Sequence, residues 1–514
     1  MKRRGIMKKV VIDGNNLTIE DVVKVARDKW EVVLSEVAKE RIVHSREIVD
    51  RYVKEGKVVY GITTGFGKFS DVVISKEDTE ALQKNLIMSH SCAVGDPLPE
   101  EVVRAIMLLR ANALAKGFSG VRLETVETLI EMINKNVVPV IPEKGSLGAS
   151  GDLAPLAHMV LVMIGRGEAF YAGERVSGEE AMRRAGIPTI TLSSKEGLAL
   201  INGTQVMSAL GCLNVYDAKR VIAVADAVAS MTLEALRGII DAFDDRVQMV
   251  RPHKGQIVSA KNVRKMVEGS ELITRQGEIR VQDAYTLRCI PQVHGAVRDA
   301  ISYIERVLGV EINSATDNPL IFPDDGEVIS GGNFHGEPVA LTMDFLSIAL
   351  SEIANISERR IERLVNYQLN DLPPFLTEKG GLNSGMMIAQ YTAASLVSEN
   401  KVLSHPASVD SIPSSGNQED HVSMGTIAAR KAREVLKNVT TVLAIELLTA
   451  SQALEFRKGF KRGKGTDRIY RLVREKVKPL VEDRELYIDI NACFDIIRSG
   501  RIEEVLKEEG IMLE

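Results

Sequence analysis

Hydrophobic residues in the second half of the chain recur mostly at three- and four-residue steps, the spacing of an amphipathic or buried helix. Similar patterns, almost free of helix breakers, cover residues 206–243, 338–369 and 386–403. Long helices of this kind bury their apolar stripes against one another. We therefore predict an all-α protein with a central bundle of long helices. The pattern is clearest in residues 426–454, with apolar positions at Val435, Val439, Val442, Leu443, Ile445 and Leu447.

The first half of the chain is interrupted more often by Gly, Pro and Asn, and its helical patterns are shorter. This change predicts two parts: a smaller, loop-rich N-terminal part over residues 1–205, and a part with the long-helix bundle and the C-terminal helices over residues 206–514. The shorter helices are predicted over residues 20–41, 75–88, 100–112 and 122–136. Strand signals are few, and they cover residues 10–13, residues 187–192 and a possible hairpin at residues 320–329.

The composition excludes several classes of protein. Of the 514 residues, 45% are hydrophobic and 26% are charged, which excludes an intrinsically disordered chain. A net charge of −5 gives no excess of positive charge for nucleic acid or an anionic membrane, and aromatic residues are only 4%. The apolar runs near the N-terminus and at residues 159–164 are too short for a secretory signal or a membrane span. We expect a soluble, cytoplasmic protein with no nucleic-acid or membrane partner.

Sequence motifs for metals and nucleotides are missing. The four cysteines are far apart and form no C-x-x-C pair, which argues against a disulfide framework and a structural zinc site. None of the eight histidines forms an i, i+4 pair, and the sequence has no P-loop and no G-x-G-x-x-G motif after a strand. The sequence therefore predicts neither a metal ion nor a nucleotide cofactor.

The most unusual segment is the Gly-rich stretch PEKGSLGASGDLAPLAHM at residues 142–159. In one interpretation it is a loop that caps the following helix, with Ser150 or Asp152 as the N-cap. In the other, a tight turn presses the nitrogen of Gly151 against the carbonyl group of Ala149, which glycine permits because its nitrogen is little hindered. Cyclisation and dehydration would then convert Ser150 to a dehydroalanine within a five-membered ring. The residues by themselves leave both interpretations open.

The segment GSLGASGDLAPLAH resembles the signature of the aromatic amino acid ammonia-lyases. Seven further segments, between Tyr60 and Gly425, resemble the same family and follow its order along the chain. They are YGITTGFGKF, NLIMSHSCAVG, EGLALINGTQ, VQDAYTLRCIPQVHG, NSATDNPL, SGGNFHGEP and SGNQEDHVSMG. The resemblance implies an all-helical fold with one catalytic unit over about residues 10–480.

The resemblance also implies a prosthetic group, 4-methylidene-imidazole-5-one (MIO), formed autocatalytically from Ala149, Ser150 and Gly151. Ammonia is a poor leaving group and the β-hydrogen of an amino acid is weakly acidic, so the reaction needs an electrophile and a positioned base. The methylene carbon at Ser150 would be the electrophile. The implied base is Tyr60, whose phenol, with an ordinary pKa of about 10, would need a lowered pKa. Glu419 remains an alternative base.

Other site residues follow from the same resemblance. Arg288 resembles the clamp for the substrate carboxylate, which a guanidinium group binds bidentately. Gln282, Tyr285 and Arg288 are three residues apart, so in a helix they would lie near one face, with Gln282 binding substrate and Tyr285 taking part in catalysis. Asn202 resembles the donor that polarises the MIO ring, and Phe334 resembles the aromatic wall over the substrate. Without the family context, Asn202 could cap a helix and Phe334 could be a core residue.

Two positions favour histidine as the substrate. This chain has Ser89–His90, as do the family members that act on histidine, whereas those acting on phenylalanine or tyrosine have Phe-Leu or His-Leu. His90 would pair with the substrate ring, since an unpaired buried polar group costs about 1–3 kcal/mol. Glu419 stands where the other members have an amide, and it can accept an imidazole N–H. Alternatively, His90 is a core histidine and Glu419 a helix-terminal charge.

The expected reaction is therefore the release of ammonia from L-histidine to give trans-urocanate. The alternatives are an MIO-dependent aromatic amino acid 2,3-aminomutase, a phenylalanine or tyrosine lyase, and a non-catalytic helical scaffold. The resemblance further implies a homotetramer whose sites combine residues from several subunits.

Overall fold

The computed structural model describes residues 8–65, 74–75 and 78–514, and 59% of the chain is helical. This fraction is well above the roughly one third that is average for soluble proteins, and the strands are few and short. The predicted all-α fold class is confirmed.

The chain divides into two units, each built from three segments. The sequence predicted parts at residues 1–205 and 206–514, whereas two later segments belong to the first unit. Long-range contacts explain the difference, because Leu17 N donates to Asn313 Oδ1 at 2.9 Å and Met424 N donates to Leu147 O at 3.0 Å. The first unit comprises Met1–Tyr216, Glu305–Asp344 and Pro406–Arg430, and the second comprises Asp217–Ile304, Phe345–His405 and Lys431–Glu514.

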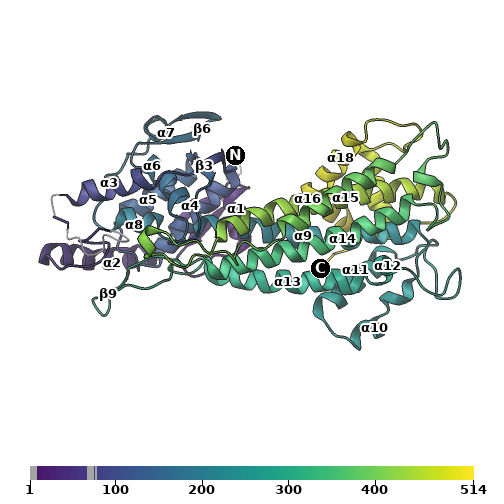
Figure 1. Ribbon diagram of the computed structural model, residues 1–514, viewed down its shortest axis with the longest axis horizontal. Helices are drawn as coiled ribbons and strands as arrows, with labels where there is room; N and C mark the ends of the chain where they lie inside the picture. Colours follow the sequence, from purple (N-terminus) through teal and green to yellow (C-terminus); the bar gives the residue numbers. More distant parts are fainter. Residues whose placement is uncertain (1–7, 66–73, 76–77) are drawn as a thin grey trace, which may run out of the picture. The chain divides into compact units, whose positions relative to one another are not determined.

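The first unit combines short helices with small two- and three-stranded sheets (Figure 1). The helices α4 and α6 are largely buried and form much of its core. Its elements are β1 (Lys9–Ile12), α1 (Ile19–Ala26), β2 (Glu31–Leu34), α2 (Glu36–Glu55), α3 (Thr79–His90), β3 (Val94–Pro97), α4 (Glu100–Ala115), α5 (Leu123–Asn134), β4 (Val138–Pro139), β5 (Pro142–Lys144), α6 (Leu153–Met163), β6 (Glu168–Tyr171), β7 (Glu174–Ser177), α7 (Gly178–Ala185), α8 (Glu196–Ile201), β8 (Leu320–Phe322), β9 (Glu327–Ile329) and η4 (Ser415–Asn417).

Two sequence predictions in this unit were wrong. Residues 20–41 were predicted as one helix, but β2 interrupts them and pairs in parallel with β1, because Val32 and Leu34 alternate into the core and Ser35 caps α2. Residues 187–192 were predicted as a strand but have no ladder partner. Their apolar side chains are buried, and Ile190 N donates to Met163 O at 3.0 Å. The predicted hairpin at residues 320–329 is confirmed as β8 and β9.

Periodicity predicted three of four long helices (Figure 1), which are α9 (Gln205–Ala235), α13 (Ile290–Glu311), α14 (Glu337–Val365) and α16 (Gly425–Leu454); α13 was not predicted. The second unit also contains η2 (Ile240–Phe243), α10 (Asp245–Met249), α11 (Lys254–Met266), α12 (Tyr285–Arg288), η3 (Pro374–Leu376), α15 (Met387–Leu403), η5 (Glu455–Arg457), α17 (Lys464–Lys476), α18 (Leu486–Ser499) and α19 (Arg501–Glu508).

Buried polar contacts join these helices within the second unit. Glu446 of α16 accepts hydrogen bonds from Thr232 of α9 at 2.8 Å and from Ser357 of α14 at 2.6 Å. The Arg360 guanidinium of α14 binds the same carboxylate at 2.6 and 2.8 Å. A fully buried charge needs such partners. The predicted bundle of long helices is therefore present, with a polar network inside it.

Two of the long helical segments are long and apolar enough to cross a membrane by length and composition, namely α14 and Gly425–Arg457. Their apolar windows are 67% and 83% buried inside the protein, respectively. Both therefore pack as core helices against other parts of the chain.

Candidate active site

The Ala149-Ser150-Gly151 segment lies in a tight turn between β5 and α6. Gly148 and Gly151 pair as an isolated antiparallel bridge, with Ala149 and Ser150 between them. Both glycines have a left-handed φ, +74° and +73°, which residues with a side chain rarely adopt. Ala149 and Ser150 therefore lie in a tight turn closed by two glycines.

Gly151 packs directly against Gly203. The two residues form a parallel bridge, and Asp152 N donates to Gly203 O at 2.7 Å. A Cβ atom added to Gly151 would lie 2.1 Å from Gly203 O, and one added to Gly203 would lie 2.4 Å from Thr316 O. Neither position has room for a side chain, so contact between backbones holds the turn in place.

Asp152 stabilises this turn and the start of α9 together. Its buried carboxylate accepts hydrogen bonds from Val206 N and Met207 N at 2.9 and 3.0 Å. It also accepts hydrogen bonds from Ser146 Oγ at 2.8 Å and from Thr426 Oγ1. Burial raises the pKa of the carboxyl group. In the capping interpretation of this segment, the sequence predicted that Ser150 or Asp152 caps α6. Asp152 precedes α6, but its side chain bonds the N-terminus of α9 instead.

Asn202 is aimed at the turn. It follows α8, and its side-chain amide donates to the Ser150 carbonyl oxygen at 2.8 Å. The Asn202 carbonyl oxygen accepts a hydrogen bond from Arg110 Nη1 at 2.8 Å, and the same nitrogen donates to Gln205 Oε1 at 2.9 Å. Burial lowers the pKa of Arg110 to about 10. Sequence reasoning missed Arg110, because nothing local distinguishes one arginine in an apolar helix.

Glu419 contacts the hydroxyl group of Ser150. Ser150 Oγ donates to Glu419 Oε1 at 3.1 Å, and Ser414 Oγ donates to the other carboxylate oxygen at 3.0 Å. The carboxylate follows η4, so it is held by a loop and not as a charge inside a helix. The alternative interpretation of Glu419 as a helix-terminal charge is therefore not supported.

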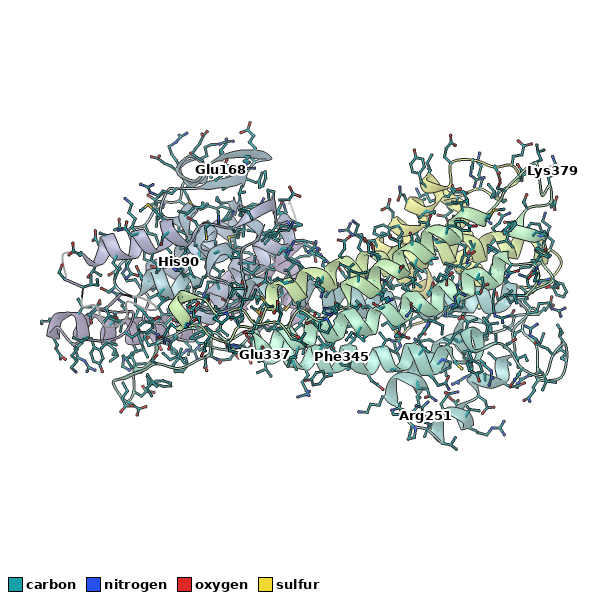
Figure 2. The ribbon with its side chains drawn as sticks, viewed as in Figure 1. His90, Glu168, Arg251, Glu337, Phe345 and Lys379 are labelled. Carbon is teal, nitrogen blue, oxygen red and sulfur yellow. The ribbon has the colours of Figure 1, made fainter. Side chains whose placement is uncertain are left out.

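His90 is the last residue of α3, where Figure 2 labels it. Its Nδ1 atom lies 3.0 Å from Ser89 Oγ. Burial lowers the pKa of His90, while the negative charge of Glu419 acts in the opposite direction.

The loop that carries Phe334 reaches the same region. Phe334 is half-buried, two residues before Gly336, and a Cβ atom on Gly336 would lie 2.9 Å from Ser423 Oγ. Ser423 Oγ in turn lies 3.5 Å from Gly148 O. The role of Phe334 as an aromatic wall stays a prediction.

Tyr60 begins a turn after α2 and is half-buried. Ile62, in the same turn, packs in a cluster with Ile48, Val49 and Ile321. The rest of the predicted Gly-rich loop, from residue 66 onward, lies outside the described residues. The role of Tyr60 as the base stays a prediction.

Gln282, Tyr285 and Arg288 belong to the second unit. Only Tyr285 and Arg288 lie in the short helix α12, so the three do not share one helical face as the sequence had suggested. Tyr285 is 70% exposed, and the Arg288 guanidinium lies 4.5 Å from the centroid of its ring. Arg288 Nε is buried and has no hydrogen-bond partner among the described residues.

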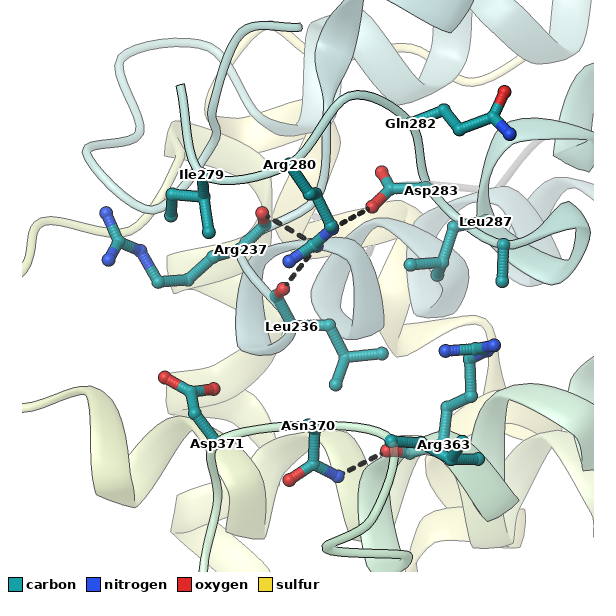
Figure 3. Close-up of a pocket in the computed structure, with 12 residues that line it drawn as sticks. Leu236, Arg237, Ile279, Arg280, Gln282, Asp283, Leu287, Arg363, Asn370 and Asp371 are labelled. Carbon is teal, nitrogen blue, oxygen red and sulfur yellow. Dashed lines mark hydrogen bonds and ion pairs between the residues drawn. The ribbon is translucent and has the colours of Figure 1, made fainter. Parts of the chain in front are cut away.

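A cavity of about 570 Å³ lies beside this segment in the second unit (Figure 3). Gln282 and Leu287 line it together with Arg280, whose guanidinium binds Asp283 at 2.6 Å and the carbonyl oxygen of Leu236 at 2.7 Å. These contacts hold the backbone before α12 in place. They therefore also fix the position of Gln282, which lies between Arg280 and Asp283.

In the first unit, hydrogen bonds therefore bring together Ser150, Asn202 and Glu419, and His90 belongs to the same unit. The Asn202 amide can stabilise negative charge on the Ser150 carbonyl oxygen. The Glu419 carboxylate can accept a proton, and the His90 imidazole can hydrogen-bond to a polar ring. The arrangement suits an elimination from a substrate with a polar side chain.

Known proteins match almost the whole chain. The family model named Aromatic amino acid lyase matches residues 17–475. A curated histidine ammonia-lyase from Caldanaerobacter subterraneus subsp. tengcongensis is 99% identical over 508 residues, which cover 99% of this chain and 100% of that protein.

Solved structures match as well. The crystal structure of histidine ammonia-lyase from Trypanosoma cruzi has a TM-score of 0.91 at 44% identity, over 97% of this chain and 95% of that chain. Tyrosine aminomutase from Streptomyces globisporus has a TM-score of 0.95 at 39% identity, over 98% of this chain and 100% of that chain. The shape of the backbone alone does not separate a lyase from an aminomutase.

Proposed function

The chain belongs to the aromatic amino acid lyase family, and from this premise we propose that it eliminates ammonia from L-histidine to give trans-urocanate. The structural observation that carries the proposal is the 3.1 Å contact between Ser150 Oγ and Glu419 Oε1. It brings the candidate electrophile next to a carboxylate that can accept an imidazole N–H. The 99% identity to a histidine ammonia-lyase supports the same substrate.

The proposed prosthetic group is MIO, made from Ala149, Ser150 and Gly151. The turn fits its formation, because Gly151 has no room for a side chain and Asn202 donates to the Ser150 carbonyl oxygen. When formed, the group supplies an electrophile that turns ammonia into a better leaving group. Asn202 would stabilise the negative charge that then develops on the oxygen it already contacts.

Arg288 is the proposed clamp for the substrate carboxylate. Its buried Nε–H group has no hydrogen-bond partner among the described residues. A guanidinium group binds a carboxylate through two parallel hydrogen bonds. Gln282 and Tyr285 would complete substrate binding and catalysis from the same segment, and Phe334 would cover the substrate. We also propose the family's homotetramer, whose sites combine residues from several subunits. The proposed location is the cytoplasm.

Two residues remain candidates for the base that takes the β-proton, Tyr60 and Glu419. The variants Tyr60→Phe and Glu419→Gln separate them by hydrogen–deuterium exchange at the β-carbon of histidine. The true base is the one whose loss stops exchange, while loss of a residue that only orients the ring weakens binding and leaves exchange measurable. Near-normal turnover in Tyr60→Phe would exclude Tyr60.

The first experiment combines an intact mass with an ultraviolet assay. We expect the purified chain to be lighter than its sequence by two water molecules and to form urocanate from L-histidine. Ser150→Ala should restore the full sequence mass and abolish the reaction, while Ser302→Ala, at an exposed position of the second unit, should keep the mass deficit.

Each other outcome excludes part of the proposal. Cinnamate or coumarate formed from phenylalanine or tyrosine, without urocanate from histidine, would overturn the substrate. A β-amino acid in place of ammonia would indicate an aminomutase. An unmodified mass would indicate a scaffold without catalysis.

A further inference from the structure

Three side chains from two segments distant in sequence meet in the first unit. They are His335 in the loop before α14, Glu337 at the first position of α14, and His421 in the loop before α16. One ring nitrogen from each histidine and one carboxylate oxygen all lie within 4.8 Å of one another. We propose that these residues form a binding site for a divalent cation of the zinc type.

The donor set suits such an ion. Two imidazoles and one carboxylate are typical ligands of Zn²⁺ and of its neighbours in the first transition row, with water completing the coordination. Ligand atoms about 2.1 Å from a tetrahedral zinc ion are about 3.4 Å from one another. Small rotations of the three side chains would therefore bring their ligand atoms to this distance. The two imidazole rings are stacked, at an interplanar angle of 5° and a centroid distance of 5.7 Å, so at least one ring must rotate before both rings can bind one ion.

A second observation points to a missing partner. Glu337, labelled in Figure 2, has a buried Oε2 atom with no hydrogen-bond partner among the described residues. A carboxylate is attracted to the N-terminus of a helix, yet no N–H group of α14 donates to this oxygen. A buried carboxylate oxygen without a partner is costly, and such groups are rare in folded proteins. A cation bound here would satisfy it.

The other contacts of the His335 ring are long enough to be exchanged for a metal. His335 Nδ1 accepts a hydrogen bond from Glu337 N at 3.3 Å, and His335 Nε2 lies 3.4 Å from His421 O. Both distances exceed the usual 2.9–3.0 Å of an N–H···O bond. Either ring nitrogen could therefore turn toward an ion at little cost.

A bound ion would join two loops that border the candidate active site. His421 follows Glu419 by two residues, and His335 follows Phe334 directly. Cross-linking these loops restricts the positions of both neighbours. Because the ion binds the native state, it should also raise the melting temperature, and the increase should grow with the logarithm of the ion concentration above Kd. The site requires neither MIO nor turnover, so it stands or falls independently of the proposed function.

The test uses the full chain without a polyhistidine tag, stripped with a chelator and titrated with Co²⁺. We expect one Co²⁺ per chain, a visible absorption band that Zn²⁺ displaces, and a higher melting temperature. His335→Ala and His421→Ala should each weaken Co²⁺ binding by about 100-fold or more, since even partners of metal ligands contribute about 10–100-fold. Glu337→Gln keeps the shape of the side chain but removes its charge, and it should weaken binding less.

Three controls make the outcome decisive. His253→Ala removes an exposed histidine of the second unit and should leave the titration unchanged, as should Cys92→Ser, which removes an exposed thiol. Ser150→Ala should still bind Co²⁺, which separates this site from the proposed catalysis. The proposal is overturned if the titration shows no site that depends on His335 and His421. It is equally overturned if these variants change only the oligomeric state, because another subunit would then be the missing partner.

Discussion

Asn202 donates its side-chain amide to the Ser150 carbonyl oxygen at 2.8 Å, while its own carbonyl oxygen accepts a hydrogen bond from the buried Arg110. The hydrogen bond from Arg110 holds the backbone of Asn202 in place. The side-chain amide of Asn202 therefore points at the Ser150 carbonyl oxygen and need not reorganise during a reaction. Such preorganised donors are a large source of catalytic power.

Asn202→Ala should therefore lower kcat for histidine by about 10²–10³-fold, as for removal of one oxyanion-hole donor. The rate of urocanate formation at saturating histidine measures it. Asn15→Ala, at an exposed position of the same unit, is the control and should keep its rate. A rate for Asn202→Ala within about twofold of the wild type would contradict this role.

Gly203→Ala should disrupt the turn that carries Ser150. Its Cβ atom would lie 2.4 Å from Thr316 O and 2.5 Å from Arg110 Nη1, and overpacking costs about 1–3 kcal/mol or more. Gly173→Ala is the matched control, because Gly173 also has a positive φ but nothing lies within 4 Å of an added Cβ. Thermal unfolding and intact mass should show a larger loss of stability, and less dehydration of Ser150, in Gly203→Ala. Equal effects in the two variants would refute the steric argument.

His90→Phe should change the choice of substrate. Loss of a hydrogen bond to the imidazole ring costs about 1–3 kcal/mol, so kcat/KM for histidine should fall by about 10- to 100-fold. An apolar side chain in the same place should favour phenylalanine, and the ratio of the two kcat/KM values is the measurement. Unchanged selectivity would mean that His90 does not contact the substrate ring. His253→Phe, in the second unit, should leave both values unchanged.

Asp226 should make the protein sensitive to acid. Its burial opposes ionisation, but the charge of Arg298 and hydrogen bonds from His294 and Ser259 outweigh it and lower the pKa of Asp226 to about 2. A depressed carboxyl pKa contributes stability above the unfolded value near 4, here about 2 kcal/mol, and this is lost as the pH falls from about 4 to about 2.

Denaturant unfolding between pH 5 and pH 2 measures this contribution. Asp226→Asn should be less stable at pH 5, and its stability should fall less steeply toward pH 2. Asp96→Asn, at an exposed position, should follow the wild-type curve. Parallel curves for Asp226→Asn and the wild type would show that the buried contacts of Asp226 do not control acid unfolding.

Local patterns in the sequence were sufficient for much of the fold. The spacing of apolar residues predicted α14, α15 and α16 closely, because helix periodicity is a property of neighbouring residues. The Gly-rich turn around Ser150 was also predictable, since glycine marks positions where no side chain fits. Local patterns gave wrong predictions where a segment pairs with another segment distant in the sequence. β2 was taken for helix because its partner β1 lies outside any short window.

The sequence by itself thus determined the helical fold class, the Gly-rich loop around Ser150 and the family resemblance. Only the tertiary structure decided which groups surround that loop. Ser150 and Glu419 are 269 residues apart, and Arg110 lies 92 residues before Asn202. His335 and His421 likewise come from different loops. Such contacts follow from the packing of whole helices, because side chains distant in sequence meet only once the core has fixed the paths of their loops.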